Sequence, residues 1–121
     1  MKYLLLIYDN EQNNMEKMTK SPEAMEQTMD AWFKYTADLQ SSGLLLAGEA
    51  LQPTPTATTV RAGNPATLAT DGPFAETKEQ LGGFYMVEAA DLDDAIEWAG
   101  NMPHIADGGT VEIQPIMVFD H

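Results

Sequence analysis

The sequence predicts an α+β fold, a ferredoxin-like antiparallel sheet with two helices on one face. The first observation is that Tyr3 to Tyr8 is apolar at odd and even positions alike, as in a strand that lies centrally in its sheet. The second is a pair of helix-like segments, each opened by a capping residue. The third is their order, because elements that follow one another as βαβ(β)βαβ place both helices on the same face.

The first helix is predicted from its two ends. Ser21 is a suitable N-cap, Pro22 fits the first helical position, and Gly43 stands where a left-handed C-terminal cap is expected. The polar stretch Asn10–Lys20 before it is expected to be a loop. Apolar residues at helical spacing form the expected core stripe of this helix, which is Met25, Met29, Trp32, Phe33, Thr36 and Leu39 or Gln40.

Further strands and a second helix are predicted after this cap. Strands are expected at residues 44–51, 58–61, 67–70, 84–89 and 110–119. Asp91, with Asp94 three residues further on, marks the start of a helix that runs to about Gly100. The two helices are expected to cover the same side of the sheet.

Composition limits the classes of function. A chain of 121 residues with 44% hydrophobic residues is expected to form a single domain, residues 1–121. The formal net charge of −13 would repel nucleic acid and anionic membranes, so neither is expected as a partner. The apolar N-terminal run is too short to span a bilayer. The absence of cysteine suits a reducing, cytoplasmic location.

The sheet face opposite the helices is expected to need a partner. Large apolar residues point to both faces along Tyr3–Tyr8, Phe84–Val87 and Ile116–Phe119, and an exposed apolar sheet face is unusual in a monomer. We therefore expect a homodimer that packs sheet against sheet. The alternative is that a long loop, such as Asn10–Lys20, folds across that face.

One run of residues resembles the signature of a known family. The run from Asp71 to Phe84 reads D-G-P-F-A-E-T-K-E-Q-L-G-G-F, which combines a turn, a polar cluster and two glycines that permit close approach of a ligand. It is similar to the signature of the DGPF family, a branch of the YCII-related proteins, and residues 2–8, 56–61 and 111–116 also resemble that family. The resemblance implies a dimeric α+β barrel among small bacterial proteins that are often found beside extracytoplasmic-function sigma factors.

Two departures limit what the resemblance implies about chemistry. The YCII branch has a His on its first helix and an Asp in a D-P-[FY] element, which together are proposed as a catalytic dyad. Here the helix over residues 22–42 contains no histidine, and the matching tripeptide reads Met102-Pro103-His104. Gln114 stands where the family more often has Arg, so an anion contact is missing. The lyase or hydrolase chemistry of that dyad therefore does not carry over.

Three residues are candidate catalytic groups, namely Asp71, Glu76 and His104. Partial burial raises the pKa of a carboxyl group toward neutrality, and His104 is one of 2 histidines, the other being the terminal His121. Each candidate has a structural alternative. Asp71 would cap its turn, Glu76 would be solvated, and His104 would complement the dipole at a helix end.

Four residues are candidate substrate-binding groups, namely Lys78, Phe74, Arg61 and Tyr8. Lys78 and Arg61 would hold a ligand carboxylate, or else pair with acids of this chain, such as Glu49 opposite Arg61 on a neighbouring strand. No cofactor or metal is expected, because the chain lacks cysteine, H-x-x-H spacing and phosphate-binding glycine motifs. A carboxylate site for a hard cation is left open.

Two functions are consistent with these residues. The first is small-molecule binding, or weak lyase or isomerase activity, in a cleft lined by Asp71, Phe74, Glu76, Lys78 and His104. The second is a non-catalytic dimer that acts through protein contacts, linked to a sigma-factor circuit as the resemblance implies. The first predicts that these side chains converge on one hollow.

Overall fold

The computed structural model describes residues 1–119, except for the side chains of residues 17–20. Its main sheet has four antiparallel strands in the order β2-β5-β1-β6. The strands of this sheet are β1 (Lys2–Asp9), β2 (Leu45–Ala50), β5 (Gln80–Glu88) and β6 (Thr110–Pro115). With β1 and β5 in the centre, the sheet has the ferredoxin-like order, so the predicted fold class is confirmed.

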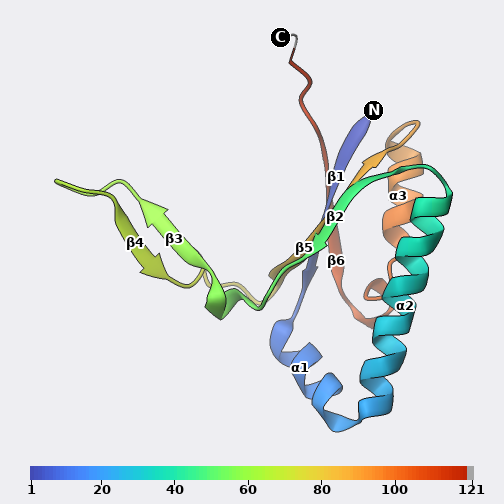
Figure 1. Cartoon of the computed structure of the whole chain (residues 1–121), viewed down its shortest axis with the longest axis horizontal. Coiled ribbons are helices and arrows are strands. Elements are labelled where there is room, and N and C mark those ends of the chain that lie inside the picture. The colour runs from blue at the N-terminus through green and yellow to red at the C-terminus, as the bar shows by residue number, and fades with distance from the viewer. Residues whose placement is uncertain (120–121) are drawn as a thin grey trace.

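Two helices cover one face of this sheet, as predicted (Figure 1). They are α2 (Pro22–Ser41) and α3 (Leu92–Gly100). The Ser21 hydroxyl accepts a hydrogen bond from Ala24 N at 3.1 Å, and Asp91 Oδ1 accepts one from Asp94 N at 2.9 Å. Both residues therefore cap their helices, and Gly43 has the left-handed φ of +82° after α2.

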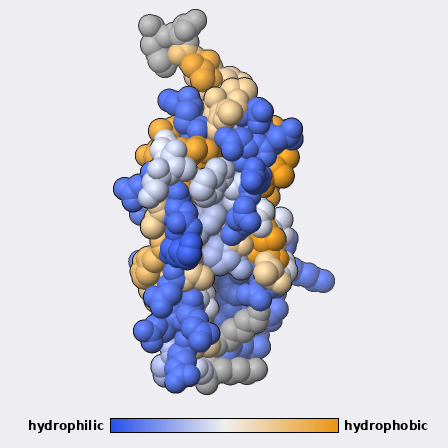
Figure 2. All heavy atoms as spheres, turned by 90° about the vertical axis from the view of Figure 1, so that its right-hand side faces the viewer, coloured by the Kyte–Doolittle hydropathy of each residue, from blue (hydrophilic) through white to orange (hydrophobic). Residues whose placement is uncertain are grey.

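The core lies between these helices and the sheet. Leu5 on β1, Val87 on β5 and Leu39 on α2 are 0% exposed. Side chains alternate between faces along a strand, so Tyr3 and Leu5 point to the helices while Leu4 and Leu6 point to the opposite, open face. The outer surface of the helix layer is mainly hydrophilic (Figure 2). The apolar open face is thus the unusual side of the molecule.

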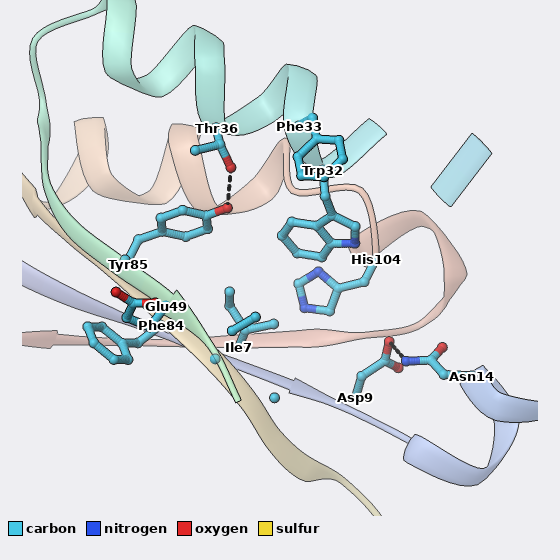
Figure 3. Close-up of a pocket in the computed structure, with 14 residues that line it drawn as sticks. Ile7, Asp9, Asn14, Trp32, Phe33, Thr36, Glu49, Phe84, Tyr85 and His104 are labelled. Carbon is cyan, nitrogen blue, oxygen red and sulfur yellow. Dashed lines mark hydrogen bonds between the residues drawn. The ribbon is translucent and has the colours of Figure 1, made fainter. Parts of the chain in front are cut away.

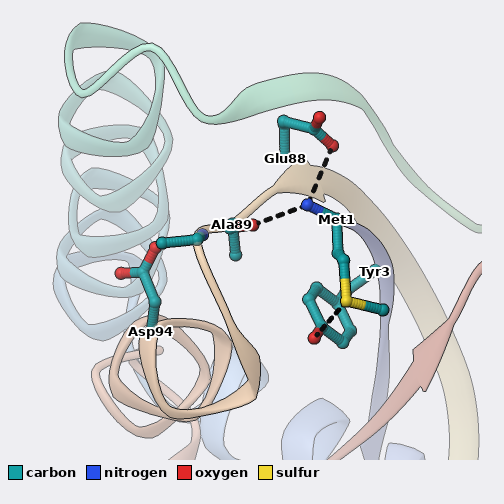
Figure 4. A network of polar contacts seen from close by, with 6 residues as sticks. Met1, Tyr3, Glu88, Ala89 and Asp94 are labelled. Atoms are coloured by element: carbon teal, nitrogen blue, oxygen red, sulfur yellow. Dashed lines mark hydrogen bonds and ion pairs between the residues drawn. The ribbon is translucent and has the colours of Figure 1, made fainter.

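The start of β1 is joined to the end of β5 (Figure 4). The ammonium group of Met1 donates to Ala89 O at 2.9 Å and lies 3.8 Å from Glu88 Oε2. Ala90 N donates to Asp94 Oδ2 at 3.0 Å, so the acid of the first turn of α3 also holds the segment that leaves β5. These contacts fix where α3 begins relative to the sheet.

The segment predicted as a loop, Asn10–Lys20, is instead a helix, α1 (Glu11–Lys20). Its capping residues explain why. Asn10 Oδ1 accepts from Asn13 N at 2.9 Å, and the Glu11 carboxylate accepts from Thr54 N and from Thr54 Oγ1, both at 2.8 Å. This short polar helix is stabilised by its cap and by a contact distant in sequence rather than by an apolar stripe. The spacing of hydrophobic residues therefore did not predict it.

The core stripe expected for α2 is only partly correct. Leu39 is buried, but Met25 and Met29 are 43% and 42% exposed. The N-terminal half of α2 extends past the end of the sheet and lies beside α1 (Figure 1), so these methionines have no sheet to pack against. The strand limits that differ most from the prediction are the start of β5, at Gln80 instead of residue 84, and the end of β6, at Pro115 instead of residue 119.

A second, two-stranded sheet projects from the base of β2 and β5. It pairs β3 (Thr58–Arg61) with β4 (Leu68–Asp71), and Figure 1 shows it extending away from the open face as an arm. Its exposed apolar residues include Val60 at 63% and Leu68 at 58%. Arg61 lies opposite Leu68, not opposite Glu49, so the predicted cross-strand ion pair between Arg61 and Glu49 is wrong.

Candidate functional site

A cleft of about 460 Å³ opens between α2 and the strands β2 and β5. Figure 3 shows aromatic side chains on one side and the edge of the sheet on the other. Strands β1, β2 and β5, helices α1 and α2 and the segment after α3 all contribute to its wall. The lining residues are Ile7, Asp9, Asn14, Trp32, Phe33, Thr36, Gly48, Glu49, Ala50, Gly82, Gly83, Phe84, Tyr85 and His104.

The aromatic wall of the cleft is held by hydrogen bonds to its phenol groups. Tyr85 Oη lies 2.6 Å from Thr36 Oγ1, and Tyr35 Oη donates to Trp98 O at 2.7 Å. Burial, and to a lesser extent the neighbouring Tyr85, raises the pKa of Tyr35 above its ordinary value. Tyr35 therefore stays a protonated donor, and the ring of Tyr85, 5.6 Å from that of Tyr35, is fixed against it.

Two glycines make room for this wall. A Cβ atom at Gly48 would lie 2.6 Å from Tyr85 Cδ1, so the Tyr85 ring lies directly over the backbone of β2. A Cβ atom at Gly83 would lie 2.7 Å from Glu49 O. Both distances are shorter than van der Waals contact allows, so the floor of the cleft is backbone without side chains.

His104 closes the far end of the cleft. It precedes a 3-10 turn, η2 (Ile105–Asp107), and is only 5% exposed. Its ring lies 5.3 Å from that of Trp32 with the two planes 34° apart. Gly109 is also close to the ring, because a Cβ atom there would come within 2.7 Å of His104 Cγ. The imidazole therefore packs against an indole and a glycine backbone rather than lying exposed at a helix end.

The hydrogen bonds of His104 define its tautomer. Nε2 lies 3.1 Å from the carbonyl oxygen of Thr110. A carbonyl oxygen only accepts, so Nε2 carries the proton and, in the neutral ring, Nδ1 is a bare acceptor. Nδ1 is buried and has no hydrogen-bond partner. An unsatisfied buried acceptor costs about 1–3 kcal/mol, which a ligand donor would recover.

The rim of the cleft near His104 is acidic. Asp9 Oδ1 accepts from Asn10 N at 2.9 Å, and Asp9 Oδ2 accepts from Asn14 Nδ2 at 2.7 Å. Figure 3 places the Asp9 carboxylate on the His104 side of the cleft. Glu49 lines the other end, but its register with β5 puts its side chain on the open face of the sheet. Among the residues whose side chains the structure describes, no Lys or Arg lines this cleft.

The residues predicted from the sequence are not brought into one hollow. His104 lines the aromatic cleft, whereas Tyr8, Phe74 and Glu76 line a wide groove of about 1020 Å³ at the base of the arm. Lys78 lines a third, smaller hollow of about 230 Å³ with Asp9, Asn10 and Glu79, among others. The remaining two, Arg61 and Asp71, lie exposed on the arm and line none of these three hollows.

The run from Asp71 to Phe84 nevertheless borders all three hollows. Its last residues, Gly82 to Phe84, line the aromatic cleft, Lys78 and Glu79 line the small hollow, and Pro73 to Leu81 supply much of the groove wall. Sequence reasoning missed Asp9 and treated Trp32 as core packing. The available signal was the pair Gly82-Gly83, which indicated close approach of a ligand without indicating which side chains face it.

Neither a metal centre nor a membrane span is found in the described part of the chain. No three His, Asp or Glu side chains there are grouped as metal ligands would be. No described helix is both long and apolar enough to cross a membrane. His121, the second histidine, lies outside the described residues.

Comparison with known proteins places the chain in a family. A model of the YCII-related domain matches residues 1–120, so the chain belongs to the YCII-related family, as the sequence resemblance implied. An uncharacterized protein of Rhizobium meliloti (strain 1021) is 41% identical over 70 residues. That match covers 57% of this chain and 56% of the relative, so it spans little more than half of either protein.

Proposed function

We propose that this YCII-related protein binds a small molecule in the cleft between α2 and strands β2 and β5. The observation that carries the proposal is His104, which is 5% exposed and presents a buried Nδ1 without a partner at the end of an aromatic cleft. Small-molecule sites are mainly apolar hollows with a few well-placed polar groups. The cleft has this composition, because aromatic rings form its wall and a few polar groups lie among them.

Weak lyase or isomerase activity would use the same cleft. Both reactions move a proton, and His104 is the histidine that lines the cleft, histidine being the side chain that most often transfers protons in enzymes. Its neutral tautomer leaves Nδ1 as the acceptor. Asp71 and Glu76, the other catalytic candidates, lie outside the cleft and would act only on a ligand that extends toward the arm.

A fragment screen read by NMR tests the proposal. The two tryptophans provide a site probe and an internal control, because Trp32 lines the cleft while Trp98 packs against Tyr35 at a ring distance of 6.1 Å and does not line it. Cleft binders are expected to shift the indole N–H signal of Trp32 and to leave that of Trp98 in place. If a diverse library leaves the Trp32 signal unmoved, the cleft is not a binding site.

We also propose a homodimer formed through the open sheet face. Neither α2 nor α3 covers this face. Its apolar side chains include Leu4 and Leu6 on β1 and Phe84 and Met86 on β5. The arm adds exposed apolar surface on the same side, and an isolated two-stranded sheet is marginally stable in water. A second copy would cover both features.

Analytical ultracentrifugation tests the dimer. The wild-type protein is expected at twice the chain mass of 13.3 kDa. Leu6→Asp places a charge in the middle of the open face and is expected to give monomers, while the matched change Ile96→Asp on the exposed side of α3 leaves the dimer intact. A monomeric wild-type protein at micromolar concentration would exclude this assembly.

A further inference from the structure

The chemistry of the cleft indicates which ligand it takes, provided that it binds a small molecule as proposed above. Its walls include the rings of Trp32, Phe33 and Tyr85, which favour a flat ligand. Phe33 is 64% exposed although it lies on this wall, so part of the aromatic surface is free for stacking. These residues select shape but not charge.

Charge is selected by the rim and by the whole chain. Asp9 lines the cleft beside His104, and no described Lys or Arg side chain balances its charge there. The formal net charge of −13 adds a negative field around the molecule. A carboxylate or phosphate ligand would be repelled, whereas a cation over an aromatic ring is attracted by the ring and by the acids together.

The polar contact is selected by His104. Because Nε2 donates to Thr110 O, the neutral ring offers only an acceptor at Nδ1. That atom is buried and unpartnered, so it is complementary to an N–H donor and not to a carbonyl or carboxylate oxygen. Flat shape, positive charge and an N–H donor are therefore required by three separate features of one cleft.

We propose that the cleft binds a flat organic cation, such as an aromatic amidine or amine, whose N–H group donates to Nδ1 of His104 while Asp9 balances its charge. Nδ1 is buried, so the donor reaches it only when a neighbouring side chain moves. Trp32 is the neighbour that we expect to move, because its ring lies 5.3 Å from that of His104 and the residue is only half-buried. Phe33 and Tyr85 remain as the aromatic wall.

Three probes of matched shape test this inference, namely benzamidine (a cationic donor), benzamide (a neutral donor) and benzoate (an anion without a donor). Binding is followed by the indole signal of Trp32 and by the ¹⁵N shift of His104 Nδ1, which the His121→Asn variant assigns. Benzamidine is expected to bind about tenfold more tightly than benzamide, as one nearby carboxylate in a partly solvated site suggests. Benzoate is expected not to bind.

Two variants separate charge from donor recognition. Asp9→Asn is expected to lower benzamidine affinity to that of benzamide while benzamide is unaffected, and the matched Glu97→Gln on α3 changes neither affinity. His104→Phe keeps a ring against Trp32 but removes Nδ1, so both benzamidine and benzamide should lose about tenfold or more in affinity. If His104→Phe fails to fold, the ratio of benzamidine to benzamide affinity in Asp9→Asn still tests whether the cleft selects a cation.

The outcomes distinguish this inference from the proposed function. Three results would show that the ligand is not a cation while the cleft remains a binding site. They are benzoate binding as tightly as benzamidine, an unchanged ratio of benzamidine to benzamide affinity in Asp9→Asn, and a Trp32 signal that only uncharged or anionic fragments shift. If no fragment of any charge shifts that signal, both the proposed function and the inference fall.

Discussion

Gly109→Ala is expected to displace His104 and to destabilise the protein. A Cβ atom at residue 109 would lie 2.7 Å from His104 Cγ and 2.9 Å from His104 O, and the ring has little room to move because His104 is buried and packs against Trp32. Overpacking of this kind costs about 1–3 kcal/mol, and loss of the hydrogen bond from Nε2 to Thr110 O costs about 0.5–1.5 kcal/mol. We expect a loss of about 2–4 kcal/mol in the free energy of unfolding.

Urea unfolding followed by circular dichroism measures this loss, and the ¹⁵N signals of His104 report the movement of the ring. Gly109 does not have a positive φ, unlike Gly108 at +91°, so alanine itself is not strained there and the effect isolates the contact. Gly100→Ala is the matched control, because its Cβ atom would meet nothing within 4 Å. A Gly109→Ala protein that is as stable as wild type and has unshifted His104 signals would refute the close packing of His104 against Gly109.

Three further predictions concern the scaffold of the cleft. Leu39→Ala is expected to lower the free energy of unfolding by about 2–5 kcal/mol, because Leu39 is 0% exposed, as urea titration would show. Asp91→Ala removes the N-cap of α3 and is expected to cost about 1 kcal/mol in the same assay. Burial raises the pKa of Tyr35, so the protonated phenol contributes its full stabilisation below pH 10 and loses it as the pH rises further. Tyr35→Phe is therefore expected to reduce the fall in the free energy of unfolding that is measured above pH 10.

The parts of the fold that were predictable have local signals of their own. Ser21, Gly43 and Asp91 mark helix ends by the chemistry of single residues, and the structure confirms all three. The central position of β1 followed from an apolar run on both faces. Each signal lies within a few consecutive residues, so it can be recognised in the sequence before the contacts in space are known.

The cleft was not predictable because its parts are brought together only by the fold. His104 meets Trp32 across 72 positions of sequence, and nothing near His104 in the chain indicates that an indole and a glycine backbone enclose its ring. Helix α1 was missed for a similar reason, since Glu11 is anchored by Thr54. Asp9 reaches the cleft rim because Asn14 of that unexpected helix holds its carboxylate.

The glycines of the run from Asp71 to Phe84 gain a specific role from this arrangement. Gly83 on β5 and Gly48 on β2 face the cleft from neighbouring strands, and a methyl group at either position would strike Glu49 O or the Tyr85 ring. A side chain at Gly83 would therefore displace β2, and one at Gly48 would displace the Tyr85 ring from its place on the cleft wall. The end of the run therefore keeps the cleft open, while its acidic middle faces the groove and the small hollow. A ligand of the cleft would thus contact the backbone of this run at Gly82 and Gly83 rather than the carboxylate of Glu76.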